Sequence, residues 1–160
     1  MQGGGVHLVD LMVWLTGQLP ASVTTMGNRI CTEETPFRYD DYMAATFRFD
    51  SGLIGRISAN FGCVHRHQHV VRVFGTKATF VSDDQGARLH TQRNPGEPPQ
   101  RIGQAPLPAT KGELIPEFVA AILAGEDWRG RTQHELDVIG ACLAADEALA
   151  AGRAVEIPST

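Results

Sequence analysis

A histidine and an aspartate three residues apart are the first candidates for chemistry in this chain. The opening segment, MQGGGVHLVDLMVWLTG, places the glycines 3–5 ahead of His7 and Asp10. On a helix, residues at i and i+3 share a face. His7 could then act as a general acid or base. Equally, it could pack beside an aspartate that the helix dipole stabilises. The spacing alone leaves both interpretations open.

The glycines themselves raise the question of a nucleotide loop. A dinucleotide fingerprint reads G-x-G-x-x-G between a strand and a helix. Gly3 and Gly5 fit this pattern, but Leu8 stands where the third glycine belongs, and no strand-forming run precedes them. The phosphate-loop pattern GxxxxGK[ST] is absent from the sequence. We therefore interpret the glycines as a turn into a helix and predict no cofactor-binding residues.

A second cluster is the alternating run HRHQH, with His65, His67 and His69. On a strand these imidazoles would project from one face and could bind Zn²⁺ or Ni²⁺. No acidic residue or cysteine lies directly beside them in the sequence. We therefore favour a solvated edge segment and predict no metal site.

Periodicity predicts the elements that would position these residues. An apolar helix over 6–15 is closed by Gly17. A second helix spans about 113–124, and a third begins at Thr132, where Glu135 completes a capping box. The Pro-rich stretch 92–111 is predicted to be a loop. Strands are predicted at 21–30, 42–50, 53–61, 69–75, 78–82, 87–92 and 154–157.

Alternation along 42–50 and 53–61 assigns the two faces of the sheet. It predicts that four large residues pack under the helices: Phe47, Phe49, Ile57 and Phe61. It predicts that the opposite face carries Thr46, Arg48, Ile54, Arg56, Ser58 and Asn60. The expected fold is a single α+β domain over 1–160, an open, mostly antiparallel sheet with helices packed on one face.

Composition excludes several classes of protein. The net charge is −4, the pI is near 5.8 and no run of Lys or Arg occurs, so no basic field recruits nucleic acid or an anionic membrane. Three isolated cysteines without a CxxC motif suggest neither a disulfide framework nor a zinc site. With no signal peptide and no apolar run long enough to span a membrane, we expect a cytoplasmic protein.

Four segments in order carry a family resemblance: GGGVHLVDLMVWLTG, DDYMAATFRFDSGLIGRISANF, VFGTKATF and GRTQHELDVIGACLAADEALAAGRAVEI. Together they resemble the C-terminal domain of the Gfo/Idh/MocA oxidoreductases, which include glucose–fructose oxidoreductase and inositol dehydrogenase. The resemblance implies a sugar or cyclitol dehydrogenase that uses NAD or NADP, bound by an N-terminal Rossmann domain. It also implies assembly as a homodimer or larger oligomer through the sheet face.

Carried onto this chain, the resemblance makes His7 the catalytic histidine and implies that Asp10 and His67 bind substrate. Gly3 stands where the family motif has an aspartate, and neither a Rossmann domain nor a Glu-Lys-Pro motif occurs in the sequence. We therefore expect a substrate-binding domain that binds no cofactor alone and is not catalytically complete. The alternative is a non-catalytic binding or oligomerisation module that retains the fold.

Overall fold

The computed structural model describes residues 4–103, 105 and 109–158. Their fold is built from two compact units. The first unit draws on residues 1–63 and 127–160, and the second on residues 64–126. Each unit contains an antiparallel sheet of its own.

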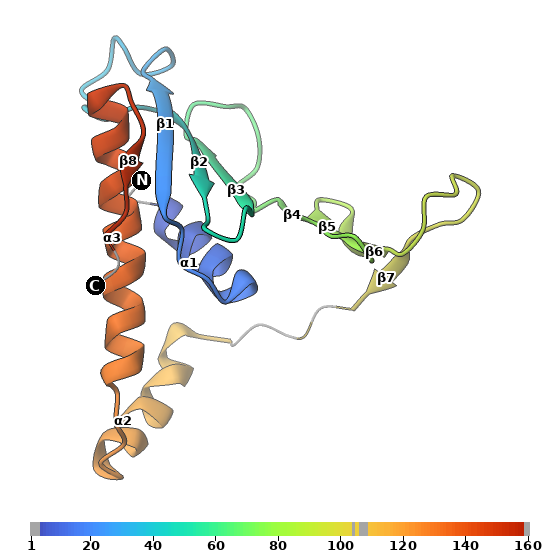
Figure 1. Ribbon diagram of the computed structural model, residues 1–160, viewed down its shortest axis with the longest axis vertical. Helices are drawn as coiled ribbons and strands as arrows, with labels where there is room; N and C mark the ends of the chain where they lie inside the picture. Colours follow the sequence, from blue (N-terminus) through green and yellow to red (C-terminus); the bar gives the residue numbers. More distant parts are fainter. Residues whose placement is uncertain (1–3, 104, 106–108, 159–160) are drawn as a thin grey trace. The chain divides into compact units, whose positions relative to one another are not determined.

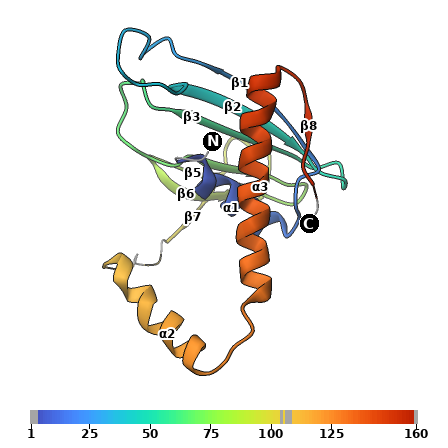
Figure 2. The ribbon, with the colours of Figure 1, turned by 90° about the vertical axis from the view of Figure 1, so that its left-hand side faces the viewer.

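The first unit is an antiparallel sheet covered by two helices (Figure 1). The strand order is β3-β2-β1-β8, and neighbouring strands are antiparallel throughout. Helix α3 lies on one face of this sheet (Figure 2), where it packs against β1 and β8, while α1 packs against β3 and α3. The elements are α1 (Gly5–Thr16), β1 (Ser22–Asn28), β2 (Tyr42–Arg48), β3 (Ile54–Asn60), α3 (Arg129–Ala151) and β8 (Val155–Glu156).

Glycines end both helices of this unit, and at Gly17 the sequence predicted it. Gly17 and Gly152 each have φ of 63°, a left-handed conformation that favours glycine. The start of α3 was predicted wrongly: the helix begins at Arg129, so Thr132 lies inside its first turn. The capping box occurs instead at Thr110, whose backbone N–H donates to the carboxylate of Glu113 at 3.3 Å.

The core of the first unit lies between the sheet and its two helices. Phe47 and Phe49 are almost completely buried, at 0% and 1% exposure. Apolar residues of the two helices close over them: Val9 and Val13 from α1, and Val138, Ala141, Cys142 and Ala145 from α3. The prediction for Ile57 is confirmed, because it is 4% exposed. Helices therefore pack on one face of an antiparallel sheet, as expected.

Phe61 was predicted in this core, and that prediction is wrong, because its side chain is 66% exposed. The strand β3 ends at Asn60, whose side-chain oxygen accepts hydrogen bonds from the backbone N–H groups of Gly62 and Cys63. The chain turns there, so the alternation of faces stops one residue before Phe61. The opposite face is as predicted: its six residues are all exposed.

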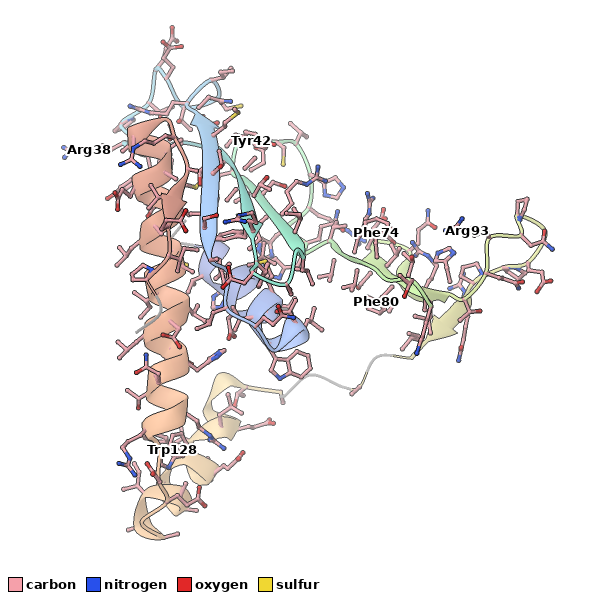
Figure 3. The ribbon with its side chains drawn as sticks, in the orientation of Figure 1. Arg38, Tyr42, Phe74, Phe80, Arg93 and Trp128 are labelled. Carbon is pink, nitrogen blue, oxygen red and sulfur yellow. The ribbon has the colours of Figure 1, made fainter. Side chains whose placement is uncertain are left out.

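The second unit contains a separate antiparallel sheet of order β4-β5-β6-β7. The sequence predicted one sheet, whereas the described residues form two sheets of four strands each. The strand β7 lies within the predicted loop 92–111. Figure 3 marks Phe74 and Phe80, from β4 and β5. The elements are β4 (Val71–Phe74), β5 (Thr79–Asp83), β6 (Gly86–His90), β7 (Gln100–Ile102), the 3₁₀ helix η1 (Lys111–Leu114) and α2 (Ile115–Leu123). The α+β class is confirmed.

The contrast between two phenylalanines gives a test of the core. We expect Phe47→Ala to destabilise the chain by about 3–5 kcal/mol, because it removes a fully buried ring and leaves a cavity. Phe61→Ala removes the same atoms from an exposed position and should cost less than about 1 kcal/mol. Urea unfolding followed by circular dichroism measures both. Equal losses for the two variants would contradict the assignment.

The hairpin β5–β6 is held by a two-point ion pair. Arg88 donates from Nη1 to Asp83 Oδ1 at 2.8 Å and from Nη2 to Oδ2 at 2.7 Å. These hydrogen bonds, with a further one from the backbone N–H of Gln85, lower the pKa of Asp83 from its ordinary 3.8 to about 2. The folded hairpin therefore favours the ionised carboxylate.

This pKa shift predicts an acid-dependent loss of stability. A carboxylate with a depressed pKa in the folded state stabilises the fold above its unfolded pKa of 3.8, and this stabilisation falls as pH drops toward about 2. The melting temperature of wild type should therefore exceed that of Arg88→Met at neutral pH. We expect calorimetry to show this difference shrinking below about pH 4. Arg93→Met, in an exposed loop, is the control, and a pH-independent difference would contradict the prediction.

Candidate functional site

Helix α1 presents His7 to solvent. The helix is two-sided: Val9 and Val13 are buried against the sheet, whereas His7 and Asp10 are exposed. An exposed imidazole at this place is not a packed core histidine. It is accessible to a ligand, which general acid or base chemistry requires.

The carboxylate of Asp10 contacts a histidine that the sequence reasoning did not single out. Nε2 of His134 lies 2.6 Å from Oδ1 of Asp10, across 124 positions of sequence. The side chains are 35% and 52% exposed respectively, so the pair lies at the surface of the helix interface. A hydrogen bond of this kind is charge-assisted, because the acceptor is an ionised carboxylate.

The position of His134 follows from the core stripe of α3. Val138, Ala141 and Ala145 bury their side chains at helical spacing, and His134 stands one turn ahead of Val138 on the same face. A polar residue in register with an apolar stripe was the signal available in the sequence. The sequence could not show that Asp10 is the partner of His134, because this contact depends on how α1 packs against α3.

His67 does not lie on a strand. The segment between β3 and β4 that contains HRHQH is irregular, and the rings of His67 and His69 meet edge to face with centroids 5.2 Å apart. His67 belongs to the second unit, and His7 and Asp10 belong to the first. The structure therefore gives no arrangement that joins His67 to them, and its role stays a prediction.

The geometry offers no metal centre among the described residues, where no group of three or more His, Cys, Asp or Glu side chains is placed to hold an ion.

A shallow hollow of about 480 Å³ lies at the start of α3, where Figure 3 marks Trp128. It is lined by Trp128, Arg129, Thr132, Gln133 and Leu136. His7 and Asp10 are not among the residues that line this hollow.

The described residues do not fit a dinucleotide. That group is held by a parallel β-α-β unit with a glycine loop at the helix start. Every strand pair in the described ranges is antiparallel. Gly3, which replaces the motif aspartate, lies outside the described residues.

None of the described helices is both long and apolar enough to cross a bilayer.

Comparison with known proteins identifies the family. A family model for the GFO/IDH/MocA C-terminal domain matches residues 2–81. The chain belongs to the GFO/IDH/MocA family. This match covers α1 with His7 and Asp10, the strands β1 to β4 and the first residues of β5. No curated protein matches the chain.

Solved structures extend the likeness to the whole fold of this GFO/IDH/MocA chain. A levoglucosan dehydrogenase in complex with NADH and levoglucosan is 19% identical, with a TM-score of 0.75 over 99% of this chain and 50% of its own. Aldose-aldose oxidoreductase from Caulobacter crescentus, complexed with glycerol, is 20% identical, with a TM-score of 0.74 over 95% of this chain and 45% of its own. Myo-inositol 2-dehydrogenase from Lactobacillus plantarum is 16% identical, with a TM-score of 0.66 over 96% and 47%. The chain thus spans about half the length of these proteins.

Proposed function

We propose that this chain is the substrate-binding domain of a sugar or cyclitol oxidoreductase that depends on NAD or NADP. The observation that carries the proposal is the exposed face of α1, where His7 is accessible and Asp10 is fixed by His134. Polyols are recognised through their hydroxyl groups, which both donate and accept hydrogen bonds. An imidazole beside a carboxylate supplies both kinds of partner.

His7 takes the role of proton acceptor in this proposal. A neutral imidazole can hydrogen-bond a substrate hydroxyl and accept its proton as the alcohol is oxidised. Asp10 accepts a hydrogen bond from a neighbouring hydroxyl and so orients the ring. The nicotinamide of a complete family enzyme would supply hydride chemistry. Since the described residues do not fit a dinucleotide, we assign this chain the binding and proton steps alone and expect it to bind no cofactor by itself.

The names of the similar structures support the substrate class. One of them holds levoglucosan and another glycerol, and a third is a myo-inositol dehydrogenase. These ligands share adjacent hydroxyl groups, which matches the partners offered by His7 and Asp10.

The thiols of Cys31, Cys63 and Cys142 are free, in keeping with the proposed location in the reducing cytoplasm.

Ligand binding tests the proposal directly. We expect titration calorimetry to detect binding of at least one of levoglucosan, myo-inositol, L-sorbose and glycerol, and no binding of NADH or NADPH. His7→Ala should weaken that binding about tenfold, the value of one hydrogen bond to the ligand. His90→Ala, which removes an exposed histidine of the second unit, should leave it unchanged. A wild-type chain that binds none of the four polyols would show the proposal to be wrong.

We also propose that the chain forms a homodimer through the outer face of the first sheet. The register aligns Thr24, Thr46 and Arg56 in one row across β1, β2 and β3. Met26 and Ile54 on the same face are 74% and 60% exposed, which is high for apolar residues. A flat face of short, apolar and guanidinium side chains suits sheet-on-sheet packing about a two-fold axis. This assembly would also serve the alternative function of a non-catalytic oligomerisation module.

Light scattering during gel filtration measures the assembly. We expect about twice the 17.3 kDa of a single chain. Thr46→Arg places a long charged side chain in the middle strand of the face and should yield monomers. Leu143→Arg, on the exposed side of α3, should leave the dimer intact. A wild-type mass of 17.3 kDa, or a dimer broken only by Leu143→Arg, would contradict a sheet-face dimer.

A further inference from the structure

We propose that His134 is a positioning residue for polyol binding: it fixes the carboxylate of Asp10, and Asp10 receives a substrate hydroxyl. This inference rests on the proposed function and adds a third residue to its site. Nothing in the family match points to His134, because the matched residues end at position 81. The inference comes from the contact between two helices at opposite ends of the chain.

The geometry of the contact shows which side chain donates the hydrogen bond and which accepts it. With Nε2 of His134 at 2.6 Å from Oδ1 of Asp10, the imidazole donates and the carboxylate accepts. Among the described residues, Oδ2 of Asp10 has no protein donor of its own. The Asp10 side chain as a whole is 52% exposed to solvent. One oxygen is therefore held by the protein, and the other is available to a ligand hydroxyl.

Holding Asp10 also defines its place relative to His7. The two residues are one helical turn apart on α1, where side chains at i and i+3 are about 5–6 Å apart at Cβ. Hydroxyl groups on one monosaccharide ring can reach both side chains at that separation. A carboxylate that is already oriented loses less rotational freedom when the ligand binds, so preorganisation by His134 raises affinity.

In this proposal His134 acts through its Nε2 atom. Two variants test this, because one keeps a hydrogen-bond donor near that position and the other does not. In His134→Gln the side-chain amide N–H extends about as far as Nε2, so it can still donate to Asp10. In His134→Asn the amide is one carbon shorter and corresponds to Nδ1, so it falls short. Both substitutions place a neutral, polar amide on the same solvent-accessible helix position. Glu135→Ala, at the exposed neighbouring position of α3, is the control.

The experiment is calorimetric titration of the folded chain with whichever of levoglucosan, myo-inositol, L-sorbose and glycerol binds wild type most tightly. We expect His134→Asn to weaken binding about tenfold, the effect of one charge-assisted hydrogen bond, and Glu135→Ala to have no effect. His134→Gln should stay within about threefold of wild type. In the Asp10→Ala background, exchanging His134 for Asn should then change affinity little, because His134 acts through Asp10.

Three results would overturn the inference while leaving the proposed function standing. They are wild-type affinity in His134→Asn, equal losses for the Asn and Gln variants, and an undiminished effect of His134→Asn in the Asp10→Ala background. A wild-type chain that binds none of the four polyols would refute the proposed function, and this inference with it. Melting curves confirm that each variant is folded at the titration temperature. If His134→Asn does not fold, loss of affinity in a folded His134→Gln variant overturns the inference.

Discussion

The burial of one sheet face under two helices is the constraint on which the first unit depends. Phe47 and Phe49 supply large rings at the centre of that face, and both α1 and α3 must turn an apolar stripe toward them. The stripe of α3 is unusually small, with Ala141, Ala145 and Ala148 completely buried. Small side chains let the helix approach the sheet closely, as the dense packing of protein interiors requires. The orientation of every other residue on these helices follows from this packing.

The candidate site is a consequence of the same packing. Because Val9 and Val13 face inward, His7 and Asp10 must lie on the outer side of α1. Because Val138 and Ala141 face inward on α3, His134 reaches the border between the two helices. There the imidazole meets Asp10 at 2.6 Å. The core that stabilises the unit therefore also orients the polar groups, which is an economical way to preorganise a binding surface.

Membership of the GFO/IDH/MocA family and the likeness to dehydrogenase structures show which kind of fold this is, and the chain spans about half of those proteins. The strands that are described pair only in antiparallel fashion, so they do not form the parallel β-α-β unit that holds a dinucleotide. Function must therefore be argued from the residues of the site, since a shared fold does not by itself fix an activity.

The sequence by itself determined the elements whose signals are local. The apolar run before Gly17, the alternation in β2 and β3, and the inward positions of Phe47 and Ile57 could all be read from periodicity. Two wrong predictions also have local causes. Asn60 turns the chain before Phe61, so Phe61 is not buried, and the short strand β7 lies in the Pro-rich segment that was predicted to be a loop. Only the tertiary structure decided that the strands form two sheets and that Asp10 meets His134. A contact across 124 positions leaves no periodic trace, because it depends on how two helices pack on a common sheet.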